Sequence, residues 1–314
     1  MPLSVAFCPA GISSFFEVCR RDEAGHALTD PARIGARGGG FVIAPGVTSR
    51  VTVRKRYRTR IAIRINSRPA PEAHTTRSAI EQLINAAGLA LDVSVEIRVE
   101  VPIAAGFGTS AAGTLASCLA LTEAGNLPLT FNEVGRAAHV AEVLNGTGLG
   151  TVSALLYGGF VLVKEPGAPG IGLIDRLRFP PDHSIVCAYL ASIQTRQALA
   201  VKDEHIRYGT QARSALKTIS RNPTLPVFLA ESRKFGKRAG FETPRITRLL
   251  STLMSAGVIG AAQNMIGEAV HAVVESSRTT RVLKEVRTAF PDAKVFACPI
   301  ESQGVRLLKD NAKH

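Results

Sequence analysis

Cysteine is scarce in this chain, and the few cysteines present are not arranged for pairing. There are five in 314 residues: Cys8, Cys19, Cys118, Cys187 and Cys298. Their number is odd, they lie far apart and no C-x-x-C pair occurs, which argues against a disulfide framework and against a zinc site. This cysteine usage is typical of proteins from a reducing compartment.

Long hydrophobic runs are missing as well. No apolar run approaches the roughly 20 residues of a membrane-spanning helix, and the first residues lack the basic and then apolar pattern of a secretory signal. Hydrophobic residues make up 46% and charged residues 20% of the sequence, as in a globular protein of one large or two ordinary domains. We therefore expect a cytoplasmic protein with no membrane partner.

Acidic residues are outnumbered by basic ones, 25 to 38, which gives a formal net charge of +13. Much of the excess lies in one segment, at Arg50, Arg54, Lys55, Arg56, Arg58, Arg60, Arg64 and Arg68. Such a cluster can bind nucleic acid. Here it alternates with valines and isoleucines, and Tyr57 is its only aromatic residue. The favoured interpretation is the solvated face of an amphipathic hairpin, so nucleic acid is not the expected partner.

The glycine-rich stretch at residues 102–113 is the strongest candidate for chemistry. An alternating strand pattern at 92–101 precedes it, and an apolar helical pattern at 114–123 follows it. Gly106 and Gly108 let the backbone approach a ligand closely, and the free N–H groups of a helix N-terminus favour phosphate. Thr109 and Ser110 could bind magnesium, or could simply cap the helix. The stretch is not a Walker loop, and the relaxed dinucleotide fingerprint it contains is a weak match.

A second glycine-rich turn at residues 145–151 follows a helix predicted at 132–144. Thr130 and Glu133 form a capping box at the start of that helix. The same helix carries His139 and Glu142 on neighbouring positions of one face. From spacing alone, a plain surface carboxylate is the favoured interpretation of Glu142.

The remaining pattern predicts an α+β protein with a domain boundary at the Pro/Gly turn 166–170, hence domains at 1–165 and 172–314. In the first domain we expect strands at 5–8 and 12–20 separated by a turn at 9–11, strands at 41–44, 47–56, 59–66 and 159–164, and a helix at 76–87. The glycines at 35–40 predict a ligand-binding loop or a hairpin turn. In the second domain we expect strands at 184–190, 269–275 and 293–298, with helices on one side at 197–220, 225–239, 243–256 and 279–289.

Together these motifs resemble the GHMP kinase superfamily, named for galactokinase, homoserine kinase, mevalonate kinase and phosphomevalonate kinase. Residues 102–112 resemble its Pro-x-x-x-Gly-Leu-Gly-Ser-Ser-Ala-Ala phosphate loop closely, and residues 6–12 resemble its N-terminal motif loosely. Residues 260–271 stand where its third motif belongs but are poor in glycine. Within the superfamily, residues 8–17, 35–41 and 139–150 are most similar to the archaeal pantoate kinase family.

The resemblance implies the two-domain α+β GHMP kinase fold with the active site in the inter-domain cleft. The implied reaction is ATP-dependent phosphorylation of pantoate to 4-phosphopantoate in coenzyme A biosynthesis, with ATP and Mg²⁺ as cofactors and a homodimer as an assembly to consider. Two alternatives stay open. One is another small-alcohol kinase, acting on homoserine, shikimate or mevalonate. The other is a non-catalytic basic relative that binds nucleotides or RNA.

The resemblance also assigns roles to residues. Those expected at the ATP phosphates are Ala105, Gly106, Phe107, Gly108, Thr109, Ser110 and Ala111. Ser110 and Glu142 would hold magnesium. Pantoate carries a carboxylate and two hydroxyls, and its expected partners are Ser13, Ser14, Arg37, Gly38 and Gly39, with the Arg37 guanidinium on the carboxylate. His139 is expected to serve packing, and Cys8 to be a small buried residue.

The third expected catalytic position, Thr151, departs from the family pattern. Many members place an aspartate there, and a threonine cannot accept a proton as a carboxylate does. Either transfer proceeds without a strong base, or Glu142, Glu17 or a water substitutes, or the protein is catalytically dead. Because a loose phosphoryl transfer gains little from early deprotonation, we favour an active kinase.

Overall fold

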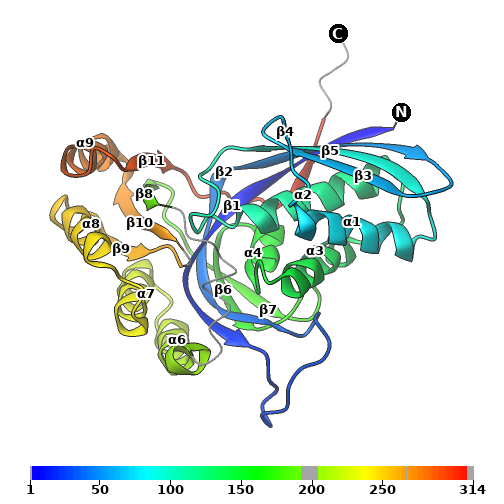
Figure 1. The fold of residues 1–314 in the computed structure, drawn as a ribbon. Coiled ribbons are helices and arrows are strands. Elements are labelled where there is room, and N and C mark those ends of the chain that lie inside the picture. The colour runs from blue at the N-terminus through cyan, green and yellow to red at the C-terminus, as the bar shows by residue number, and fades with distance from the viewer. Residues whose placement is uncertain (1, 192–203, 266, 310–314) are drawn as a thin grey trace.

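The computed structural model describes residues 2–191, 204–265 and 267–309. It contains two β-sheets, each covered by its own helices (Figure 1), which confirms the predicted α+β class. Residues 197–203 of one predicted helix lie outside the described residues.

The first sheet has eight strands: β1 (Leu3–Cys19), β2 (Gly35–Lys55), β3 (Arg60–Ile65), β4 (Arg68–Pro69), β5 (Leu91–Val99), β6 (Phe160–Glu165), β7 (Leu173–Leu177) and β12 (Arg306–Leu308). Their main order is β12-β1-β2-β5-β3-β4, and β6 pairs with both β2 and β7. β1 and β2 form a long antiparallel pair, whereas β3 runs parallel to β5.

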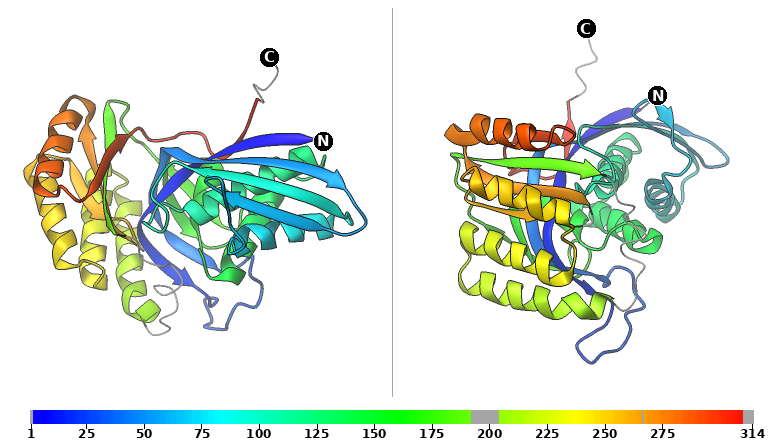
Figure 2. Two further views of the ribbon diagram at one scale, coloured as in Figure 1. Left: turned by 45° about the horizontal axis from the view of Figure 1, so that its top comes forward. Right: turned by 60° about the vertical axis from the view of Figure 1, so that its left-hand side comes forward.

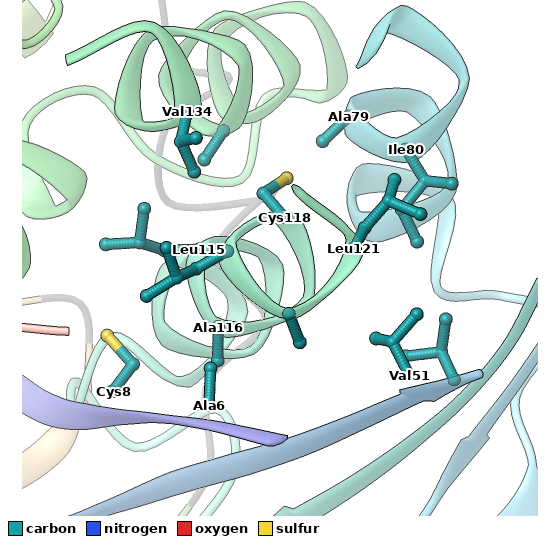
Figure 3. Packing of buried hydrophobic residues seen from close by; sticks show 14 of the residues in the cluster. Ala6, Cys8, Val51, Ala79, Ile80, Leu115, Ala116, Cys118, Leu121 and Val134 are labelled. Atoms are coloured by element: carbon teal, nitrogen blue, oxygen red, sulfur yellow. The ribbon is translucent and has the colours of Figure 1, made fainter. Parts of the chain in front are cut away.

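Helices cover one face of this sheet: α1 (His74–Ala86), α2 (Thr109–Ala124), α3 (Phe131–Asn145) and α4 (Thr151–Tyr157). α2 is the central one, since it contacts β1, β2 and the other three helices. Figure 3 shows its side chains Leu115, Cys118 and Leu121 packed among Val51 of β2 and Ile80 of α1. The start of α2 is therefore fixed by a core that surrounds the helix.

The second sheet is antiparallel, with the order β11-β8-β10-β9. Its strands are β8 (His183–Ala191), β9 (Gly260–Gln263), β10 (Glu268–Glu275) and β11 (Lys294–Cys298). The helices of this half are α6 (Glu204–Arg221), α7 (Leu225–Ala239), α8 (Pro244–Ser255) and α9 (Thr279–Ala289), and they stack along its outer side (Figure 2).

An aromatic core joins the two halves. Phe41 of β2 stacks on Phe160 of β6 with ring centroids 4.6 Å apart, and Phe228 of α7 meets Phe160 edge-on, also at 4.6 Å. Phe15 of β1 packs edge-on against Phe228 and against Phe235 of α7. All five rings are buried, so the halves share one core.

Two expectations at the N-terminus were wrong. β1 is one strand without a break at residues 9–11, because Pro9 sits at a register shift and not in a turn. The glycines at 35–40 lie inside β2, which continues through the two strands predicted at 41–44 and 47–56. A Cβ at Gly40 or Gly46 would collide with a carbonyl oxygen of β1. Glycine at these two positions allows β1 and β2 to lie in close contact.

The turn at residues 166–170, where we placed the domain boundary, separates β6 from β7. Both strands belong to the first sheet, as does β12 near the end of the described chain. The first sheet therefore includes strands from both sides of that turn, and the boundary stays a prediction.

The basic segment of β2 and β3 lies on the solvent side of the first sheet. Arg50 and Arg54 are exposed and alternate with the buried Val51 and Val53. In the strand register Glu96 stands opposite Arg50, so acidic residues are interspersed with the basic ones. The solvated basic face that the alternation predicted is present, but the predicted hairpin was wrong, because β5 lies between β2 and β3 in the sheet. In the described residues, no helix has both the length and the apolar character needed to cross a bilayer.

Candidate active site

The predicted phosphate loop is a strand–loop–helix unit between β5 and α2. Gly108 is the N-cap of α2 and has a left-handed backbone (φ 61°), and Gly106 in the loop has φ 77°. Both conformations are natural for glycine and strained for other residues. In the described structure the cap uses no side chain, so the hydroxyls of Thr109 and Ser110 are not spent on capping. The N-terminus of a long buried helix is thus open to an anion.

The loop is packed tightly on its neighbours. The Gly11 N–H on β1 donates to the Phe107 carbonyl over 3.1 Å. A Cβ at Gly108 would lie 2.7 Å from Thr151 Cγ2 at the start of α4, closer than side chains approach. Thr151 therefore stands beside the phosphate loop, where the resemblance placed the missing aspartate.

Ser110 and Glu142 meet, as the family resemblance implied. Ser110 Oγ, in the first turn of α2, donates to Glu142 Oε1 of α3 at 2.5 Å. Thr147 Oγ1, from the second glycine turn, donates to the same oxygen at 2.8 Å. Glu142 is 2% exposed; burial raises its carboxyl pKa, and the bonds from Ser110 and Thr147 oppose this effect. A buried carboxylate oriented by two hydroxyls can bind a cation, which would offset the cost of burying its charge.

The second glycine turn makes room for this carboxylate. Gly146 ends α3 in a left-handed conformation (φ 65°), and the Thr147 N–H donates back to the Glu142 carbonyl over 3.0 Å. A Cβ at Gly148 would collide with Glu142 Oε2. Glycine at this position is therefore required for Glu142 to keep its place.

One cavity brings most of the predicted residues together. Its lining includes residues 104–111 of the phosphate loop, Glu142 and Thr151, and also Ser13, Arg37, Gly38 and Gly39 on the paired strands β1 and β2. Among the described residues that line it, Glu142 is the only one with a carboxylate. The cavity thus combines the groups expected for ATP, for magnesium and for an anionic substrate.

Arg37 has the features of an anion-binding residue. It lines the cavity, and its buried Nε has no hydrogen-bond partner among the described residues. Its register partner on β1 is Glu17. That carboxylate is already engaged by Arg213 of α6, with a distance of 2.7 Å between Nη1 and Oε1. A half-buried arginine with an unused Nε donor favours a carboxylate ligand.

Other predicted site residues lie deeper. The Ser14 side chain is fully buried, is not part of the cavity lining, and bonds to His271 Nε2 at 2.9 Å. The structure therefore does not bring it to the other candidate substrate residues. Ala105 and Ala111 are buried below the loop. Phe107 touches the cavity but packs mainly into the core against Phe296, with centroids 5.7 Å apart.

His139 and Cys8 behave as buried packing residues. The His139 ring bonds through Nε2 to the Ile34 carbonyl at 2.8 Å, and burial lowers its pKa. Burial raises the pKa of the Cys8 thiol well above its usual range, which suppresses the reactive thiolate.

Sequence reasoning missed three parts of this region. Thr147 shares Glu142 with Ser110, and Met265 of the second half lines the cavity. A neighbouring hollow of about 750 Å³ extends from Thr109, Ser110 and Thr147 toward Ile65 and other residues of the first half. The position of the Thr147 hydroxyl in the second glycine-rich turn could have indicated that it contacts Glu142. No local sequence pattern indicates Met265 or the hollow, because both depend on contacts between residues far apart in the chain.

Comparison with known proteins gives concordant matches. The model of the GHMP kinases N terminal domain matches residues 74–159. Pantoate kinase of Methanospirillum hungatei JF-1 is 30% identical over 285 residues, which is 91% of this chain and 91% of that protein. Pantoate kinase of Thermococcus kodakarensis is 27% identical and covers 93% and 95% of the two chains. A solved structure described as a phosphotransferase related to the CoA biosynthesis pathway superimposes with a TM-score of 0.86 at 24% identity, over 99% of this chain and 100% of that one.

Proposed function

This chain belongs to the pantoate kinase family of the GHMP kinases, and we infer that it transfers the γ-phosphoryl group of ATP to the primary hydroxyl of pantoate. The product is 4-phosphopantoate, an intermediate of coenzyme A biosynthesis. The observation that carries this function is the single cavity that holds the phosphate loop, the Ser110–Glu142 pair and Arg37. Kinase chemistry requires these three parts side by side.

ATP binding is assigned to the phosphate loop and to the hollow next to it. The N–H groups at the start of α2 would bind the β- and γ-phosphates. The hollow begins at Thr109 and Ser110, so a nucleoside attached to those phosphates has space there. Its volume is in the usual range of small-molecule sites, about 300–1,000 Å³.

Magnesium is assigned to Ser110 and Glu142. The donor set fits this ion, since Mg²⁺ prefers hard oxygen ligands and is usually held by one or two protein groups plus phosphate and water. In the described residues no cluster of three or more His, Cys, Asp or Glu side chains competes for a metal. When bound, the ion would neutralise charge on the phosphoryl oxygens. Ser110 Oγ keeps two lone pairs while it donates its proton to Glu142, so it can offer one of them to the ion.

Pantoate is assigned to the side of the cavity formed by β1 and β2. Arg37 would bind its carboxylate, and Ser13 with the backbone at Gly38 and Gly39 would meet its hydroxyls. This arrangement would place the primary hydroxyl toward the phosphate loop. Orientation of this kind is a main source of rate in phosphoryl transfer.

No carboxylate base is assigned. Glu142 is the sole carboxylate in the described cavity lining, and it is committed to the hydroxyls and the metal. Thr151 keeps the phosphate loop packed through its methyl group. Transfer through a loose transition state needs little proton removal before the phosphoryl group has moved, so the reaction proceeds without an aspartate here.

The test is ADP release in a coupled assay with pantoate, homoserine, shikimate and mevalonate as acceptors. We expect saturable, Mg²⁺-dependent turnover with pantoate and background rates with the others. Preference for another alcohol would move the chain to a different kinase of the superfamily. Salt-sensitive RNA binding without ADP release would replace the kinase by a binding module.

A further inference from the structure

A chain of buried polar side chains connects the two halves behind the cavity. Ser14 Oγ of β1 lies 2.9 Å from His271 Nε2 of β10, and His271 Nδ1 lies 2.9 Å from Asn264 Oδ1. All three residues are 0% exposed, so solvent and substrate do not reach them.

With the Asn264 amide oxygen facing His271, one protonation state of the ring makes both hydrogen bonds. Asn264 Oδ1 can only accept a hydrogen bond, so His271 Nδ1 carries the proton and donates it. Nε2 of the neutral ring then accepts from the Ser14 hydroxyl. Burial lowers the pKa of His271 to about 3, which keeps the ring neutral at physiological pH. In this state each of the two hydrogen bonds of His271 has one donor and one acceptor.

At its first end the chain reaches the substrate side of the cavity. Ser14 is the extra residue of a β-bulge: Ser13 pairs with Gly40 and Phe15 pairs with Gly39, while Ser14 has no register partner. A bulge turns a side chain out of the normal alternation and is common beside active sites. The bond to His271 therefore holds the bulge whose neighbours, Ser13 and Phe15, line the cavity.

At its other end the chain reaches the phosphate loop. A Cβ at Gly106 would lie 2.9 Å from Asn264 Cβ, and one at Gly267 would lie 2.6 Å from the Ala105 carbonyl carbon. The neighbouring Met265 N–H donates to the Ser13 carbonyl over 2.9 Å, so the backbone here also contacts the substrate strand. Asn264 and Gly267 are thus packed closely against the phosphate loop.

A purely structural role does not account for this chain. Asn264 Nδ2 is buried with no hydrogen-bond partner among the described residues, and such a donor costs about 1–3 kcal/mol. Apolar residues of similar shape would fill the same space without that cost.

We propose that Ser14, His271 and Asn264 are positioning residues for the phosphoryl transfer, His271 being the link that sets the substrate strand and the phosphate loop at a fixed separation. This proposal rests on the proposed kinase function. It predicts unequal effects of the two hydrogen bonds of His271, here called the Ser14 arm and the Asn264 arm, because the first ends at the bulge of β1 and the second at Gly106.

The test removes one of the two hydrogen bonds of His271 at a time. Ser14→Ala removes the bond to the bulge. His271→Asn keeps an amide at the place of Nδ1 and so retains the Asn264 arm, whereas His271→Gln reaches toward Ser14 and gives up the Asn264 arm. Ser49→Ala is the matched control, since Ser49 is equally buried and bonds to Ser117 Oγ at 2.8 Å, but it does not line the cavity.

We expect Ser14→Ala and His271→Asn to raise the pantoate KM about fivefold or more and to change the ATP KM less than twofold. We expect His271→Gln to lower kcat about tenfold and to weaken ATP binding, measured also by calorimetric titration without pantoate. Ser49→Ala should keep both KM values. Variants that lose only thermal stability, with kinetic constants like those of Ser49→Ala, would overturn the proposal. If the unaltered protein does not turn over pantoate, the kinase assignment fails, while the ATP titration of His271→Gln still decides the loop arm.

Discussion

The substitution Gly148→Ala would displace the Glu142 carboxylate while the protein keeps its fold. The backbone at Gly148 is outside the left-handed region, so alanine brings no conformational strain there. Its Cβ would collide with Glu142 Oε2, the tip of a side chain, so the carboxylate moves and the backbone does not need to. We expect a folded protein with a modestly lowered Tm, since Glu142 loses its bonds to Ser110 and Thr147, whose metal carboxylate is displaced.

The size of the effect follows from the role assigned to Glu142. Loss of one group that stabilises transition-state charge costs about 10²–10³-fold in kcat. We therefore expect a loss of that order in coupled ADP release with saturating ATP and pantoate. The apparent KM for Mg²⁺ should rise, because the carboxylate no longer meets Ser110.

Gly146→Ala is the matched control. Gly146 lies two residues away with φ 65° and has no atom within 4 Å of a built Cβ. Alanine in this conformation costs about 1–2 kcal/mol, which lowers Tm by a few degrees, but it leaves Glu142 untouched. A Gly148→Ala enzyme with more than a third of normal kcat at ordinary Mg²⁺ would refute the reasoning, since Glu142 could then leave its place without consequence.

Four further results are expected from the same assay. Ser110→Ala and Glu142→Ala should each lose about 10²–10³-fold in kcat, and near-normal rates at saturating Mg²⁺ would remove them as metal ligands. Arg37→Ala should raise the pantoate KM roughly 10- to 100-fold, as loss of a hydrogen bond to a charged group does, with the ATP KM unchanged; an equal rise in both would place Arg37 elsewhere. Thr151→Val should keep kcat within about threefold, because its methyl packing is preserved, and a hundredfold loss would show that the hydroxyl takes part in the reaction. Because burial raises the Glu142 pKa, protons compete with Mg²⁺ at higher pH than for an exposed glutamate, so the Mg²⁺ KM should rise early on acidification in wild-type titrations at several pH values.

Local signals predicted the parts of the site that depend on local structure. The capping box of Thr130 and Glu133 is present at the start of α3, and Gly106 and Gly108 take the left-handed conformations that a phosphate loop requires. The meeting of Ser110 with Glu142 came from the family resemblance, not from spacing. Spacing alone favoured a surface carboxylate for Glu142, whereas its side chain is buried.

Other features depend on contacts that a local pattern does not contain. Ser14 looked like a neighbour of Ser13 in the substrate site, but the bulge turns it into the core toward His271, 257 residues along the chain. The glycines of β2 looked like a loop because their purpose, close approach to β1, appears only after the two strands pair. In each case the tertiary partner decides the role of the residue.

The aromatic core formed by phenylalanines of β1, β2, β6 and α7 limits which recombinants of this protein can fold. Phe41 and Phe160 come from one side of the turn at 166–170, and Phe228 comes from the other. A chimaera joined at that turn with a distant relative would pair rings that were never selected together, and such rings pack poorly at fixed spacing. We therefore expect viable recombinants to exchange all of these phenylalanines together. The gene segments that encode the two sides of the turn should accordingly be inherited as a unit.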